Sequence, residues 1–108
     1  MAFTIKQFDT SPTIGMNLQA ADTSAINITR AREVRFHMRP LGEADPVIDA
    51  RARVINAAGG VVAYDWLPED TAVPGRYEAE VEVTYTDGSV ETFPNGGYEI
   101  ITIVDDVT

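Results

Sequence analysis

The residues from 77 to 85, YEAEVEVTY, alternate between apolar and polar side chains without a break. Side chains on a β-strand point in turn to the two faces of the sheet, so a period of two indicates a strand that is buried on one face only. A helix would instead need apolar residues at spacings of three and four. The run therefore predicts a strand whose odd-numbered residues face the core and whose glutamates face water.

Asp87 and Gly88 follow this run after one threonine. The pair is favoured in two-residue type I′ turns, because both central residues of such a turn need a positive φ. We therefore expect residues 89–93 to return antiparallel to the first strand and to complete a β-hairpin.

The same period of two recurs along most of the chain and predicts further strands. We expect these strands at residues 3–8, 14–19, 33–39, 48–54, 62–66 and 98–104. Gly59 and Gly60 interrupt the pattern and predict a second hairpin. No long stretch has helical spacing, and the best place for a single helical turn is residues 22–25. Short strands separated by Gly, Pro, Asn and Asp predict an all-β fold, an immunoglobulin-like antiparallel β-sandwich of seven to eight strands.

The length and composition indicate one domain over residues 1–108, with mobile ends at 1–11 and 105–108. Hydrophobic residues make up 44% of the chain and charged residues 23%, as in ordinary globular proteins. A formal net charge of −9 has the wrong sign for binding a phosphate backbone, so we expect no nucleic acid partner. Without a secretion signal or a long apolar run, we expect synthesis in the cytoplasm and no membrane partner.

The outward glutamates Glu78, Glu80, Glu82 and Glu91 form an acidic row along the first hairpin. Such a row binds a cation or a basic partner, or it is neutralised by cross-strand pairs within the sheet. In an immunoglobulin-like arrangement the strand that carries Arg51 and Arg53 would lie beside this one. We therefore expect charge pairing to these arginines rather than a binding site.

Two aromatic features belong to the predicted core. Tyr64 and Trp66 share a parity with Val62, so we expect both rings to be buried, although exposed rings at these positions would stack on a sugar. Pro74 and Gly75 precede Tyr77 at the start of a strand, a pattern typical of a tyrosine corner. The Tyr77 hydroxyl should then bond to backbone upstream and hold the loop.

The sequence offers no catalytic, cofactor-binding or metal-binding site, so we expect no enzymatic activity and no cofactor. His37 is the single histidine and has no cysteine or second histidine as a partner. Asp105 and Asp106 lack the spacing of a calcium-binding loop, and the serines lack the context of a hydrolase nucleophile.

Both ends of the chain carry candidate partner contacts. Phe3, Ile5 and Phe8 are more apolar than a free tail should be, so they form a first strand of the domain or bury against a partner. Asp105 and Asp106 at the other end are further candidates for such contacts.

Three runs of this chain resemble a known family: ADTSAINITRAREVRFHMRP, GGVVAYDWLPEDTAVPGRYEAEVEV and TDGSVETFPNGGYEIITI. They are similar to small immunoglobulin-like proteins of tailed phages, related to the N-terminal domain of baseplate upper proteins. The likeness covers about Thr13 to Val104. Its most specific parts are W-x-x-x-D-T-x-x-P-G-x-Y, from Trp66 to Tyr77, and D-G-x-x-x-T-x-P-N-x-G-Y, from Asp87 to Tyr98.

The resemblance implies a non-enzymatic structural protein of a tailed bacteriophage virion. Its partners would be other virion proteins in the head, neck or tail and baseplate, with several copies on each particle. The chain lacks the helical linker and distal domain of the baseplate proteins, which favours a free-standing virion component. The alternative is an immunoglobulin-like ligand-binding module that recognises cell-surface carbohydrate.

Overall fold

The long strand β7 (Gly75–Tyr85) is the centre of the larger of two sheets in the computed structural model, which describes residues 2–107. Next to β7 on one side lie β3 (Ala31–Pro40) and then β4 (Ile48–Arg51). On its other side lie β9 (Glu99–Val104) with β1 (Ala2–Lys6) beyond it, and β8 (Val90–Phe93). The second sheet has the order β2 (Ile14–Asn17), β6 (Val61–Tyr64), β5 (Arg53–Asn56).

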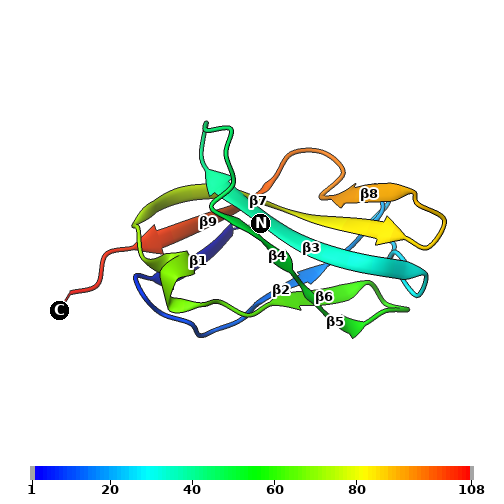
Figure 1. The fold of residues 1–108 in the computed structure, drawn as a ribbon, viewed down its shortest axis with the longest axis horizontal. Coiled ribbons are helices and arrows are strands. Elements are labelled where there is room, and N and C mark those ends of the chain that lie inside the picture. Colours follow the sequence, from blue (N-terminus) through cyan, green and yellow to red (C-terminus); the bar gives the residue numbers. More distant parts are fainter. Residues whose placement is uncertain (1, 108) are drawn as a thin grey trace.

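The two sheets pack face to face (Figure 1) and enclose one hydrophobic core. The odd-numbered residues 77–83 of β7 and the even-numbered residues 34–38 of β3 face inward, as their alternation predicts. The buried core residues are Ile5, Ile14, Leu18, Ile28, Val34, Phe36, Met38, Ile48, Val62, Tyr64, Trp66, Tyr77, Ala79, Val81, Val83, Phe93, Ile101 and Ile103. The predicted all-β sandwich is confirmed and is consistent with the immunoglobulin-like class, with nine strands among the described residues instead of seven or eight.

One strand pair departs from the expected antiparallel arrangement. β1 and β9 run parallel, with Phe3 opposite Ile101 and Ile5 opposite Ile103. Parallel neighbours need a long connection between them, and here almost the whole chain provides it. Residues 2–6 are thus a strand of their own domain, the first of the two alternatives for the apolar N-terminus.

The predicted strand 48–54 is two strands in two different sheets. The backbone N–H of Ala52 still bonds to Val34 of β3, at 2.9 Å, whereas Arg53 already pairs with Ala63 of β6. An unbroken alternation of Ile48, Ala50, Ala52 and Val54 would place Val54 on the core face. Because the chain crosses between the sheets at this point, the alternation restarts and Val54 is exposed instead. The crossing closes one side of the sandwich by covalent connection.

The turn between β7 and β8 differs from the predicted type I′ turn. The Gly88 N–H donates to the carbonyl of Tyr85 at 2.9 Å, and the Tyr85 N–H donates to the carbonyl of Ser89 at 2.8 Å. The loop therefore has three residues, and only Gly88 has a positive φ, of 87°. The Asp87 carboxylate accepts bonds from the backbone N–H and hydroxyl of Ser89, which fixes Asp87 outside the left-handed region. The hairpin itself is confirmed.

The single helical turn lies at Pro68–Thr71, not at residues 22–25. The Asp22 carboxylate bonds to the backbone N–H of Ser24, and Thr23 has a φ of 69°, so the chain turns there without a helix. At the observed turn Pro68 presets a helical φ. No helix in residues 2–107 is long and apolar enough to cross a membrane.

Gly60 offers a test of how the β5–β6 hairpin is held against the rest of the chain. It has a φ of 67°, and a Cβ there would lie 2.4 Å from the carbonyl oxygen of Ile26. Gly60→Ala should lower the free energy of unfolding by roughly 2 to 4 kcal/mol, from backbone strain and this contact together. Gly88→Ala is the matched control, since its φ is 87° with open space around it, and it should cost about 1 kcal/mol. Denaturant unfolding of both variants measures the difference; equal losses would contradict this packing.

Candidate functional site

The corner between β6 and β7 contains the run Trp66 to Tyr77, which carries the resemblance. Trp66 is 4% exposed, and its ring meets Phe36 edge-on at 5.8 Å between centroids. The Asp70 carboxylate accepts bonds from the backbone N–H of Leu67, at 2.8 Å, and from the Tyr64 hydroxyl, at 2.6 Å. Burial and this bond to Asp70 raise the pKa of Tyr64. The predicted burial of Tyr64 and Trp66 is confirmed.

Tyr77 closes the same corner from the other side. Its hydroxyl donates to the carbonyl of Val73 at 2.6 Å, so the predicted tyrosine corner is confirmed. Burial raises the pKa of the Tyr77 phenol, with a smaller contribution from Glu43. Gly75 begins β7 opposite Ile103 of β9, directly after the loop that this bond holds.

The corner also holds the segment that follows β1. Thr71 is fully buried, and its hydroxyl donates to the carbonyl of Asp9 at 2.9 Å. The Gln7 side-chain amide donates to the carbonyl of Ala72 at 2.8 Å, and the Phe8 N–H donates to the carbonyl of Thr71 at 3.0 Å. Three hydrogen bonds therefore join residues 7–9 to the corner.

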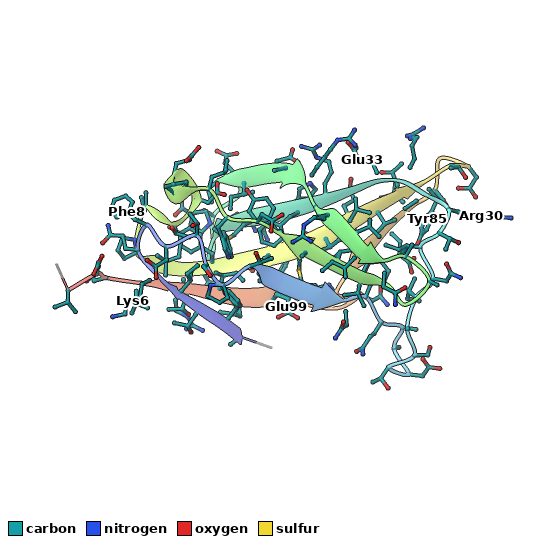
Figure 2. The ribbon with its side chains drawn as sticks, turned by 90° about the horizontal axis from the view of Figure 1, so that it is seen from below. Lys6, Phe8, Arg30, Glu33, Tyr85 and Glu99 are labelled. Carbon is teal, nitrogen blue, oxygen red and sulfur yellow. The ribbon has the colours of Figure 1, made fainter. Side chains whose placement is uncertain are left out.

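The expected partner contacts have different positions in the structure. Ile5 is 3% exposed and lies in the core, so in the folded chain it is not on a surface that a partner can reach. Phe3 is partly buried and packs against Trp66, with 5.9 Å between ring centroids. Phe8 is 57% exposed. Figure 2 shows Phe8 and Lys6 near one end of the molecule and Tyr85 near the other.

Asp105 and Asp106 lie at the same end as Phe8. They follow β9, and the Gln7 N–H donates to the carbonyl of Val104, the last residue of that strand, at 2.8 Å. Both aspartates are exposed and have no regular secondary structure. Met1 and Thr108, the outermost residues of the expected mobile ends, lie outside the described residues.

The acidic row of β7 pairs with β3 and not with the strand of Arg51. Arg39, His37 and Arg35 of β3 lie opposite Glu78, Glu80 and Glu82. The Arg39 Nε lies 3.2 Å from Glu78, whose carboxylate is largely buried and also accepts a bond from the Gly42 N–H at 3.3 Å. Each of these three glutamates therefore has a basic residue opposite it, but only Glu78 forms one of the ion pairs found within residues 2–107.

The predicted arginine partners were wrong because β3 lies between β7 and β4. Arg51 reaches Glu33 of β3, at 3.2 Å. Arg53 is in the other sheet, where its guanidinium binds Asp65 with both of its bonds at 2.9 Å. Period-two patterning shows which residues share a face but does not determine the order of the strands.

A second charged group continues along the outer face of β3 and β4. Arg35 donates to the Asp49 carboxylate at 2.7 Å, and the His37 Nε2 lies 3.1 Å from the same oxygen. The bond from Arg35 holds the pKa of Asp49 below its usual value. These groups lie on the open face of a sheet, where ion pairs contribute little to stability.

Several hollows lie on the described part of the chain. A hollow of about 500 Å³ is lined by residues that include Arg30, Tyr85 and Glu91. Two others lie beside groups described above. One, of about 190 Å³, lies beside Arg39, whose guanidinium is 5.1 Å from the centre of the Tyr98 ring and donates to the Tyr98 hydroxyl at 3.0 Å. The other, of about 620 Å³, lies between the β1 and β2 edges of the two sheets, with Phe3, Met16 and Phe93 among its lining residues. It lies on the side that no strand crossing closes.

The chemistry available at these places is binding by apolar and ionic contact. Among residues 2–107 no group of three or more His, Cys, Asp or Glu side chains is arranged to hold a metal ion. The Ser24 and Ser89 hydroxyls donate to Asp22 and Asp87 at exposed turns, which is a turn arrangement and not a nucleophile with a base.

No family model and no curated protein matches the chain. The structure does add residues that the sequence reasoning missed. Thr71 lies within the W-x-x-x-D-T run and was available from that signal, whereas Gln7 and Arg39 carried no signal beyond being polar.

The tyrosine corner can be tested with Tyr77→Phe, which removes one hydroxyl and leaves the Val73 carbonyl without this donor. The loss of a partly buried hydrogen bond should lower the free energy of unfolding by about 1 to 2 kcal/mol. Tyr85→Phe is the control, because the Tyr85 hydroxyl bonds to the side chain of Glu91 and holds no loop backbone. Urea unfolding should show the larger loss for Tyr77→Phe; a larger loss for Tyr85→Phe would argue against the corner.

Proposed function

We propose that this chain is a non-enzymatic structural protein of a tailed bacteriophage virion, made in the host cytoplasm and incorporated into the particle. Its place would be the head, the neck or the tail and baseplate, where it would act through contacts with other virion proteins. Nucleic acid and membrane are not among its proposed partners. The formal net charge of −9 has the wrong sign for binding a phosphate backbone.

The observation that carries this proposal is the role of the run from Trp66 to Tyr77. Trp66 packs in the core, Asp70 and Thr71 bond to the backbone around them, and Tyr77 holds the Val73 carbonyl. Residues that give the resemblance its specificity thus build the corner of the sandwich. This supports a shared fold with the phage proteins, and the virion role follows from that by analogy.

The surface of the sandwich is compatible with assembly through its rim. β1, β4 and β8 each pair with one neighbour in the larger sheet, and β2 and β5 are the outer strands of the other. Outer strands have unpaired backbone groups that a neighbouring chain can bind. Repeated copies of such a module can therefore bind to a particle without a deep pocket.

The proposal predicts that the chain copurifies with virions. Particles from the strain that encodes the chain, purified by density gradient, should contain its peptides in a fixed ratio to the major capsid protein, as measured by quantitative mass spectrometry. A disassembly control, in which urea-treated particles release the chain, would exclude simple cosedimentation. Finding the chain only in the soluble fraction of infected cells would contradict the proposal.

The carbohydrate-binding alternative cannot use the rings first considered for it and would need an exposed aromatic side chain. Tyr64 and Trp66 are buried, so sugar stacking would use Tyr98, which is 42% exposed beside Arg39 and the smaller hollow. We expect no binding of host surface polysaccharide in calorimetric titration of the purified chain. Binding that Tyr98→Ala abolishes, with an unchanged unfolding midpoint, would favour the alternative.

A further inference from the structure

Phe8 has two features that do not stabilise an isolated domain. Its side chain is 57% exposed, and its backbone has a φ of 66°, in the left-handed region that bulky residues rarely adopt. A residue held in such a conformation persists only where the surrounding structure determines it, and such residues occur often at functional sites.

Hydrogen bonds on both sides of Phe8 fix its position. Its own N–H donates to the Thr71 carbonyl, at 3.0 Å, and the Asp9 N–H donates to the Lys6 carbonyl, at 3.1 Å. The buried Thr71 hydroxyl donates to the Asp9 carbonyl, and the Gln7 side chain bonds to the corner. The ring is thus presented on a fixed backbone, which lowers the entropy cost of binding through it.

Other exposed apolar side chains lie on the segments that contact residues 7–9. The Phe8 tip, as we define it, consists of Phe8, Leu67, Val73 and Val104, and each of these side chains is at least 39% exposed. Gln7 bonds to the carbonyls of Val104 and Ala72, which precedes Val73, and Leu67 begins the turn that ends at Thr71. In Figure 1 this end of the sandwich is the one at which β1 and β9 terminate.

Acidic residues border this tip. Asp9, Glu69 and Asp105 follow Phe8, Leu67 and Val104 at one or two positions along the chain. Within residues 2–107 none of these three carboxylates has a salt bridge to a basic side chain. Two basic residues lie close to the tip along the strands: Lys6 is opposite Val104, and Arg76 is opposite Thr102. The tip is therefore apolar with a mainly acidic border.

We propose that the Phe8 tip is the docking surface of this chain for another virion protein, whose apolar pocket is bordered by Lys or Arg. The charge pattern selects this partner over a second copy, because two identical tips would bring acidic borders together. Phe8 is the anchor of the contact, as rigid buried aromatic residues commonly are in interfaces. The proposal rests on the virion role described above.

The test uses particles made by phage from which the gene has been deleted, to which purified chain is added back. Wild-type chain should be retained on these particles, and Phe8→Asn should reduce the apparent affinity at least about tenfold. Asn tolerates a positive φ, so the unfolding midpoint of this variant should not fall. Ile55→Asn is the matched control, because Ile55 is 55% exposed on β5, away from the tip, and it should bind as wild type.

The acidic border has its own test in the double variant Asp9→Lys, Asp105→Lys. It should bind gene-deleted particles more weakly, and the difference from wild type should shrink as salt is added. Unchanged binding by this variant would contradict the basic border of the partner. Wild-type affinity in Phe8→Asn, or an equal loss in Ile55→Asn, would overturn the docking surface while the virion role stands. Failure of wild-type chain to bind would contradict the virion role itself, and the docking surface with it.

Discussion

Aromatic rings from both sheets pack against one another in the core and join the two sheets. Phe36 of β3 is fully buried and stacks on Tyr64 of β6 with 4.6 Å between ring centroids. Trp66 meets both rings edge-on, at 5.8 and 5.5 Å. Aromatic pairs in these geometries add to the free energy of burying apolar surface. They also set where the chain leaves β6, and hence where the corner that holds Tyr77 and residues 7–9 is formed.

The two sides of the sandwich differ: the chain crosses between the sheets on one side, and the other side is open. At Ala52 the chain itself crosses between the sheets, while the β1 and β2 side is left with the hollow of about 620 Å³. The outer face of the larger sheet is occupied by ion pairs such as Arg39 with Glu78. Exposed apolar side chains also occur at the end where β1 and β9 finish, and there the backbone of residues 7–9 is held by hydrogen bonds to the corner.

Much of the fold could be predicted from the alternation of side chains, but which strands lie next to each other could not. The buried residues of β3 and β7 followed from a period of two, and Tyr77 followed from the Pro-Gly that precedes it. The partner of Glu78 did not, because alternation does not encode strand order. The exposure of Val54 and the position of Phe8 were missed for a related reason, since a sheet crossing and a positive φ depend on long-range contacts.

We propose that this two-sheet domain contacts its neighbours in the virion through the Phe8 tip. A cryo-electron microscopy reconstruction of the intact particle, at a resolution that separates side chains, tests it most directly. We expect density for the sandwich with Phe8 inserted in a neighbouring protein and Trp66 enclosed in the core. Density in which residues 7–9 and 104–107 face solvent while another part of the sandwich makes the contacts, or particles with no density for this chain, would contradict it.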